Sequence, residues 1–142
     1  MLILDTDHVS LLEWAKGDDY RRLKERLAKV ADRPIVTPNV TYEEHIRGWM
    51  AYLARARSVG QQIEAYRRLE RQLNLYRAIE VIGFDQKSAG EFQRLKAGRI
   101  RVGTMDLRIA AIALANDATL LSRNLADFAR VPGLTVLDWS AD

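Results

Sequence analysis

Residues 1–7 read MLILDTD, a short apolar run that ends at two carboxylates separated by a single threonine. An apolar run that stops at turn-forming polar residues is typical of a buried strand leading into a helix. In open α/β sheets, ligands bind beyond the carboxyl ends of such strands. Asp5 therefore lies where a ligand site is expected, and the next question is whether other carboxylates reach the same edge.

Strand-like and helix-like segments alternate along the chain of 142 residues. This alternation predicts βαβ units and a mainly parallel sheet of four to five strands with helices on both faces, in a single domain of residues 1–142. The expected strands are 2–5, 35–37, 80–84, 118–122 and 134–137. The expected helices are 7–15, 20–31, an antiparallel pair from Asn39 that breaks at Gly60, one between Asp85 and Gly98, 107–115, and a short one ending at Ala129.

The composition excludes several kinds of site. Without cysteine, the chain has no disulfide, zinc–thiolate site or cysteine nucleophile, and two histidines are too few for a histidine-rich metal site. We find no secretory signal and no apolar run long enough to span a bilayer, so we expect a cytoplasmic protein without a membrane partner. A net charge of +3, with arginines concentrated between residues 47 and 108, permits an anionic partner without requiring one.

Acidic residues follow several of the expected strands or begin the helices near them. They are Asp5, Glu43, Glu44, Asp106 and Asp127. Because the carboxyl ends of parallel strands meet at one edge of the sheet, we expect these acids to converge. Carboxylates without histidine or cysteine suit hard divalent cations such as Mg²⁺. Beside arginine-rich helices, such a site indicates phosphodiester hydrolysis in a nucleic acid.

Most of these acids also have a structural explanation. Asp7 is suited to cap the helix that follows it, and capping is the role we expect for it. Thr41 and Glu44 have the spacing of a capping box, and Asn124 and Asp127 share that spacing. Each pair can therefore cap the N-terminus of a helix instead of forming part of a functional site.

Asp106 is placed to interact with the positive end of a helix dipole. Asp5 is the hardest to explain structurally, because a carboxylate at the end of a buried strand needs a partner. His8 and His45 lie next to proposed acids, but we interpret them as structural histidines with satisfied hydrogen bonds. The stretch 5–7 also fits the nucleophile motif of haloacid-dehalogenase-type phosphatases. The adjacent acidic pair which that motif needs, here Asp18-Asp19, comes too early in the chain.

Five pieces in order carry a resemblance to a known family. They are LDTD (4–7), VTYEEHIRG (40–48), GTMDLRIAA (103–111), LLSRNLADF (120–128) and VPGLTVLDW (131–139). On these pieces the chain resembles the PIN-domain ribonucleases, specifically the VapC-type toxins of toxin–antitoxin pairs. The resemblance implies a PIN-like three-layer α/β/α sandwich over nearly the whole length.

The resemblance also implies the roles of individual residues. The catalytic acids would be Asp5, Glu44, Asp106 and Asp127; Asp5 and Asp106 would hold Mg²⁺ or Mn²⁺, with Glu44 and Asp127 as further possible ligands. The supporting residues would be Thr6, Asp7, Thr104, Ser122 and Asn124. The candidates for contact with the RNA backbone are Arg47, Arg99, Arg101, Arg108 and Arg123. The family usually has asparagine where Asp7 stands, so this pocket carries one more negative charge.

By the same resemblance, a metal-activated water would hydrolyse RNA and leave 5′-phosphate and 3′-hydroxyl ends. A small VapB-like antitoxin would inhibit the enzyme, and the chain would form a homodimer. Two alternatives stay open at this point. One is a PIN-like module that binds RNA or protein without cutting it, and the other is a structure-specific nuclease that cuts DNA by the same chemistry.

Overall fold

The computed structural model describes residues 1–142 and contains one sheet of five strands in the order β3-β2-β1-β4-β5. The strands are β1 (Leu2–Leu4), β2 (Ile35–Pro38), β3 (Glu80–Ile82), β4 (Thr119–Leu121) and β5 (Thr135–Leu137). Every neighbouring pair is parallel, so all five carboxyl ends lie at the same edge. The predicted α/β fold with a mainly parallel sheet is confirmed.

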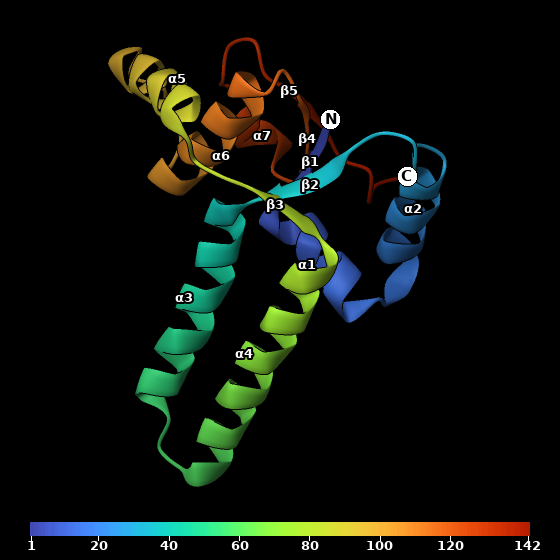
Figure 1. Cartoon of the computed structure of the whole chain (residues 1–142), viewed down its shortest axis with the longest axis vertical. Coiled ribbons are helices and arrows are strands. Elements are labelled where there is room, and N and C mark those ends of the chain that lie inside the picture. The colour runs from blue at the N-terminus through green and yellow to red at the C-terminus, as the bar shows by residue number, and fades with distance from the viewer.

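Helices precede and follow the strands along the chain. They are α1 (Thr6–Trp14), α2 (Gly17–Ala28), α3 (Asn39–Arg55), α4 (Val59–Ala78), α5 (Gln86–Ala97), α6 (Thr104–Ala115) and α7 (Leu125–Phe128). Figure 1 shows α5 and α6 together at one side of the sheet, while α3 and α4 extend away from it as an antiparallel pair. We call this pair, residues 39–78, the arm.

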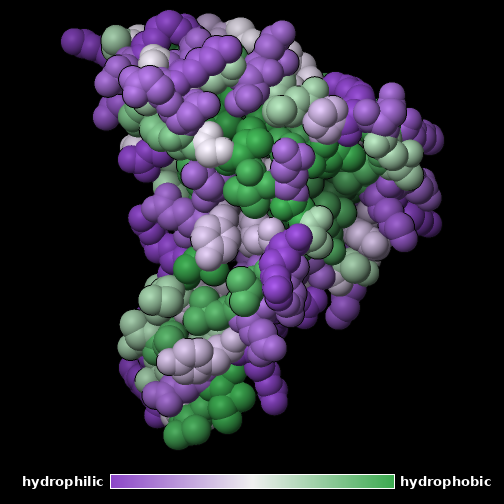
Figure 2. All heavy atoms as spheres, viewed as in Figure 1, coloured by the Kyte–Doolittle hydropathy of each residue, from purple (hydrophilic) through white to green (hydrophobic).

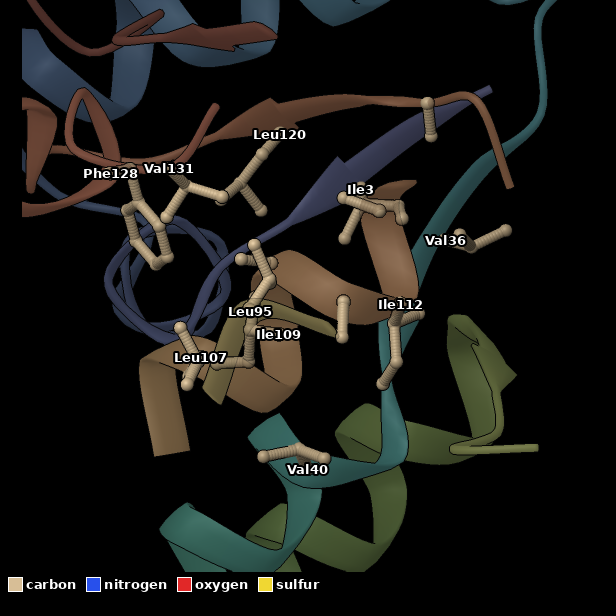
Figure 3. Packing of buried hydrophobic residues seen from close by; sticks show 14 residues of the cluster. Ile3, Val36, Val40, Leu95, Leu107, Ile109, Ile112, Leu120, Phe128 and Val131 are labelled. Carbon is tan, nitrogen blue, oxygen red and sulfur yellow. The ribbon is translucent and has the colours of Figure 1, made fainter. Parts of the chain in front are cut away.

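The two faces of the sheet have separate apolar cores, because successive side chains of a strand point to opposite faces. Ile3 of β1 shares one buried cluster with Ile109 and Ile112 of α6 (Figure 3). Leu2 and Leu4 share the other with residues of α1, α2 and α4. The sheet is therefore covered by helices on both faces, as a three-layer α/β/α arrangement requires.

Helix α6 is the most buried helix and fixes the position of one candidate acid. Its buried residues are Leu107, Ile109, Ala110, Ala111, Ile112, Ala113 and Ala115. The helix begins at Thr104, three residues before the predicted start, because the Gly103 carbonyl already accepts the N–H of Leu107 at 2.9 Å. Asp106 therefore lies inside the first turn of a rigidly packed helix.

Two other predicted boundaries were wrong. The break between α3 and α4 falls at residues 56–58, because the Ser58 hydroxyl caps α4 by accepting the Gln61 N–H at 3.1 Å; Gly60 lies inside that first turn. Helix α2 begins and ends three residues earlier than predicted, with acidic side chains in its first turn, where the helix dipole favours them. The predicted Asp85 cap and the end of α5 before Gly98 are confirmed.

The arm exposes apolar side chains along its length and at its tip (Figure 2). The large apolar residues exposed there include Met50, Val59, Ile63, Tyr66 and Leu73. None of the helices combines the length and the apolar character needed to cross a membrane. The arm therefore presents apolar surface that the fold itself leaves uncovered.

Candidate active site

Asp5 follows β1 directly and is 95% buried at the carboxyl edge of the sheet, with a relative exposure of 5%. Its Oδ1 accepts the backbone N–H of Thr6 at 2.8 Å, so Asp5 is the residue that caps α1. Its Oδ2 accepts the hydroxyl of Ser122, at 2.7 Å, from just beyond β4. The adjacent strands β1 and β4 thus bring together two residues that lie 117 positions apart.

Asp7 does not cap α1, so the capping role predicted for it was wrong. Its Oδ2 accepts the backbone N–H of Arg123 at 2.9 Å and lies 3.4 Å from the Ser122 hydroxyl. Its Oδ1 lies 2.7 Å from Nδ1 of His8. The cap falls to Asp5 because α1 begins one residue earlier, which leaves Asp7 to join the start of α1 to the loop after β4.

Glu44 is joined to the same edge through Thr6, whose hydroxyl donates a hydrogen bond to Glu44 Oε2. The capping box predicted for Thr41 and Glu44 is not formed. Helix α3 begins at Asn39, which places Thr41 inside its first turn, buried and with its hydroxyl unpartnered. The neighbouring Glu43 instead pairs with Arg47, and its side chain is 41% exposed.

Asp106 and Asp127 are linked by the side-chain amide of Asn124. The amide nitrogen lies 3.1 Å from Asp127 Oδ2 and 3.4 Å from Asp106 Oδ2. Asn124 occupies the position before α7 but makes no capping hydrogen bond with its side chain, so the capping explanation fails for it. Asp127 also lies 3.7 Å from Arg130.

The carboxylates raise one another's proton affinity. Burial raises the pKa of Asp5 from its ordinary value of 3.8 to about 6, and the negative charges of Asp7 and Asp106 add to that effect. The pKa of Asp106 is raised by burial and then by Glu44, Asp127 and Asp7. Hydrogen bonds from Ser122 and Thr6 oppose the rise at Asp5 without cancelling it. We call Asp5, Asp7, Glu44, Asp106 and Asp127 the acid cluster.

The acid cluster fits a hard divalent cation by its donor chemistry, because every donor is an oxygen. A cation there would also relieve the repulsion that raises the pKa of Asp5 and Asp106. As the side chains stand, no three acidic or histidine groups converge to hold an ion. Mg²⁺ keeps several waters and commonly takes only one or two carboxylates directly, so this arrangement is compatible with it.

Neither histidine is available to a metal ion. His8 is fully buried between Asp7 and the backbone N–H of Trp139, which lies 3.3 Å from its Nε2. His45 lies 2.7 Å from the Tyr76 hydroxyl and 3.0 Å from the Ser10 hydroxyl. Both side chains are held by hydrogen bonds within the fold, as their interpretation as structural histidines requires.

The remaining predicted residues do not all join the acid cluster. Thr104 is exposed at the start of α6 and makes no side-chain hydrogen bond. Arg47 and Arg108 line a cavity of about 390 Å³ between α3 and α6. The side chain of Arg123 lies 3.5 Å from Asp19. Arg99 and Arg101 are exposed in the loop after α5.

Sequence reasoning missed two residues that line this cavity, Asn39 and Phe84. Asn39 directly follows β2, and Phe84 comes two residues after β3; both strands end at the same edge as β1. That position was the signal that could have identified them, but after β2 and β3 only acidic and basic residues were named as candidates.

Comparison with known proteins gives a consistent result. The PIN domain family matches residues 2–134. Ribonuclease VapC2 of Rickettsia felis is 35% identical over 65 residues, which are 43% of this chain and 48% of that protein, so the match spans about half the length of this relative.

Two solved structures align over almost the whole chain. The VapBC2 structure from Rickettsia felis, bound to a DNA fragment from the promoter, has a TM-score of 0.70 at 25% identity and covers 97% of this chain and 98% of that one. DNA-bound VapBC from Salmonella typhimurium has a TM-score of 0.76 at 24% identity and covers 97% of both chains. The second likeness shows the fold alone.

Proposed function

The chain belongs to the PIN domain family, and from this premise we propose that it is a divalent-metal-dependent endoribonuclease of the VapC type. It would hydrolyse phosphodiester bonds in RNA and be inhibited by a VapB-like antitoxin. Its likeness to ribonuclease VapC2 and to VapBC complexes supports this proposal.

The observation that carries the proposal is the acid cluster. Its members are Asp5 at the end of β1, Glu44 in the second turn of α3, and, in the first turns of α1, α6 and α7, Asp7, Asp106 and Asp127. Burial and mutual repulsion raise the pKa of Asp5 and Asp106, which is a cost to the folded protein without a cation. Carboxylates with a raised pKa at the ligand-binding edge of a sheet are typical of functional sites.

Within this proposal, Asp5 and Asp106 hold Mg²⁺ or Mn²⁺, and Glu44 and Asp127 complete the negative charge around it. A bound divalent cation lowers the pKa of water and offsets charge on the phosphate being cut. Ser122 and Thr6 donate hydrogen bonds that fix the orientation of Asp5 and Glu44. Asn124 holds Asp106 and Asp127 at a set separation. Asp7 adds charge and anchors the loop after β4.

The partners follow from the same premise. A VapB-like antitoxin is proposed because the Rickettsia felis structure that this chain resembles at 25% identity is a VapBC2 complex. A homodimer is proposed on the family resemblance. The exposed apolar residues of the arm offer surface for contact with the antitoxin or with a second copy of the chain. Burying apolar side chains in such a contact is favourable because it removes them from water.

The test compares RNA cleavage by the wild type and by Asp5→Asn, each with Mg²⁺, with Mn²⁺ and with a chelator. We expect cleavage by the wild type only with metal, and almost none by Asp5→Asn. Asp18→Asn is the matched control, because Asp18 is an exposed carboxylate on α2 that pairs only with Arg21. It should cleave at the wild-type rate.

Three outcomes would contradict the proposal. Equal, metal-independent cleavage by all three proteins would remove the acid cluster from the reaction. RNA binding without any cleavage would favour the binding-module alternative. Cleavage of DNA but not of RNA with matched sequence would favour a DNA nuclease.

A further inference from the structure

The larger of the two cavities in the molecule, about 390 Å³, lies between α3 and α6, the helices that carry Glu44 and Asp106. It is lined by Asn39, Val40, Glu43, Arg47, Phe84 and Arg108. These residues come from the start of α3, the segment after β3, and α6. Strands β2 and β3 run parallel to β1, and Asn39 and Phe84 follow their carboxyl ends, so the cavity lies at the same edge of the sheet as Asp5.

Consecutive residues of α3 connect the two places. Glu43 lines the cavity, and Glu44 accepts the hydroxyl of Thr6 within the acid cluster. Arg108 lines the cavity two residues after Asp106 on α6. Side chains one or two positions apart on a helix point in different directions, so the cavity and the acid cluster are separate places on the same two helices. A chain molecule that runs along this edge of the sheet can place one group at the acid cluster and another in the cavity.

The cavity contains an uncompensated positive charge. Arg47 is neutralised by its ion pair with Glu43. Arg108 has no carboxylate or carbonyl partner: its guanidinium lies 5.6 Å from the centre of the Phe92 ring, and its one polar contact is the sulfur of Met105 at 3.8 Å. A half-buried guanidinium with unused donors is suited to bind an anionic oxygen, phosphate above all.

The other lining residues point to more than an inorganic anion. Phe84 packs edge-on against Phe92, with ring centres 5.8 Å apart and planes at 82°, which holds its ring in place. Asn39 is exposed, and its carboxamide has no hydrogen-bond partner within the chain. Aromatic rings stack on unpaired bases of single-stranded RNA, and amide groups hydrogen-bond to base edges.

We propose that this cavity binds one nucleotide of single-stranded RNA adjacent to the phosphodiester held at the acid cluster. Arg108 binds its phosphate, Phe84 stacks on its base, and Asn39 hydrogen-bonds to the edge of that base. The proposal rests on the proposed ribonuclease function and adds where the substrate strand lies next to the reacting bond.

The test separates binding from cleavage. Binding of a short fluorescent single-stranded RNA is measured with a chelator present, in the Asp5→Asn background, so that no RNA is cut. Arg108→Gln and Phe84→Leu are compared with Arg57→Gln. Arg57 is the matched control because it is an exposed arginine without an ion pair, in the loop between α3 and α4, at the far end of the arm (Figure 1).

We expect Arg108→Gln to weaken binding about tenfold and to lower the slope of log Kd against log salt by about one. Phe84→Leu should weaken binding about tenfold through lost stacking, and Phe84→Tyr should restore it. Arg57→Gln should change binding by less than about twofold. An RNA with one abasic nucleotide beside the cleaved bond should bind less tightly to protein with Phe84, but not to Phe84→Leu.

Thermal unfolding of each variant shows whether a loss of RNA binding reflects misfolding. If Phe84→Leu does not fold, the stacking role is tested by the abasic RNA with the wild-type Phe84 and with Phe84→Tyr. Equal Kd values for Arg108→Gln, Phe84→Leu and Arg57→Gln would overturn the proposal. So would a loss of cleavage by Arg108→Gln in the otherwise wild-type protein without any change in metal-free RNA binding. Failure of the ribonuclease function is a different result: the wild type itself then leaves RNA intact in the presence of Mg²⁺ and Mn²⁺.

Discussion

Glu13 on α1 and Asp5 at the end of β1 are both buried carboxylates, but the fold surrounds them differently. The side chain of Glu13 is 6% exposed, and the buried amide of Gln72 lies 2.9 Å from each of its oxygens. Arg71 adds an ion pair at 3.3 Å and also donates to the Glu13 carbonyl at 3.0 Å. Glu13 is thus compensated by groups of the chain itself.

Asp5 has no cation of the chain beside it. It receives one hydroxyl and one backbone N–H, and its neighbours in the acid cluster are other carboxylates. A buried charge that has its own cation stabilises a junction, here between α1 and α4. A buried charge that faces like charges costs stability and is retained for a function that needs it. The comparison therefore separates a compensated carboxylate, Glu13, from an uncompensated one, Asp5, which we propose as the catalytic acid.

The largest expected effect is on catalysis. Asp106→Asn should lower the rate of metal-dependent RNA cleavage about 1,000-fold, because one cation ligand carries several kcal/mol of transition-state stabilisation. Glu13→Gln should cleave at the wild-type rate per folded molecule. Steady-state cleavage rates measure both. A similar loss in both variants would remove the distinction between the two kinds of acid.

The second largest expected effect is the loss of stability when Glu13 is removed. Glu13→Ala should lower the free energy of unfolding by about 3 kcal/mol, because it leaves the buried Gln72 amide and Arg71 without their acceptor. Glu25→Ala is the control, since Glu25 is exposed on α2 and forms no ion pair. Its effect should stay within about 0.5 kcal/mol. Urea denaturation checks this, and an unchanged midpoint for Glu13→Ala would show that the junction contributes nothing.

Asp5 should respond to pH in the opposite sense from a paired carboxylate. Its pKa in the folded protein, about 6, exceeds its ordinary value of 3.8, so the folded state holds the proton more tightly than the unfolded state. Stability contributed by this group is therefore present at low pH and lost as pH rises through about 6.

Asp5→Asn removes that loss and keeps one oxygen that can accept the Thr6 N–H, while its amide nitrogen, which can only donate, faces the Ser122 hydroxyl. Without metal, the variant should be more stable than the wild type by about 2 kcal/mol at pH 8 and equally stable near pH 4. Denaturant titrations at pH 4, 6 and 8 with a chelator measure the difference. A constant difference across this range would mean that Asp5 does not titrate as described.

The smallest expected effect is stabilisation by the cation itself. At a Mg²⁺ or Mn²⁺ concentration ten times Kd, the wild type should gain about 1.4 kcal/mol of unfolding free energy. Glu13→Ala should gain the same amount, and Asp5→Asn much less. Thermal unfolding with and without the metal gives the comparison. Equal stabilisation of all three proteins would place the cation elsewhere on the molecule.

Much of the site was accessible from the sequence because it follows from the parallel sheet. Apolar runs that end at acids predicted the strands, and parallel strands bring their carboxyl ends to one edge. The positions of Asp5, Glu44, Asp106 and Asp127 relative to those strands were enough to predict their approach. The structural role of His8 and His45 was predicted on a different ground, that histidines with satisfied hydrogen bonds are commoner in proteins than metal-ligating ones.

Local spacing was less reliable where two roles share one pattern. The Thr41–Glu44 spacing fits a capping box, but α3 begins two residues before Thr41, so the box cannot form. Asp7 was expected to cap α1, but a start one residue earlier gives the cap to Asp5. A helix start is set by which backbone N–H groups lose their partners in the packed fold, and sequence spacing alone does not report it.

By itself, the sequence determined the fold class, the order of the elements and the edge at which the acids gather, because hydrophobic periodicity records which face of each element is buried. Only the tertiary structure decided which carboxylates find partners. Thr6 and Glu44 are 38 residues apart, and Glu13 and Gln72 are 59 residues apart. Such pairs depend on how α1 docks against the arm, so the difference between a compensated acid and an uncompensated one emerges only when the elements pack.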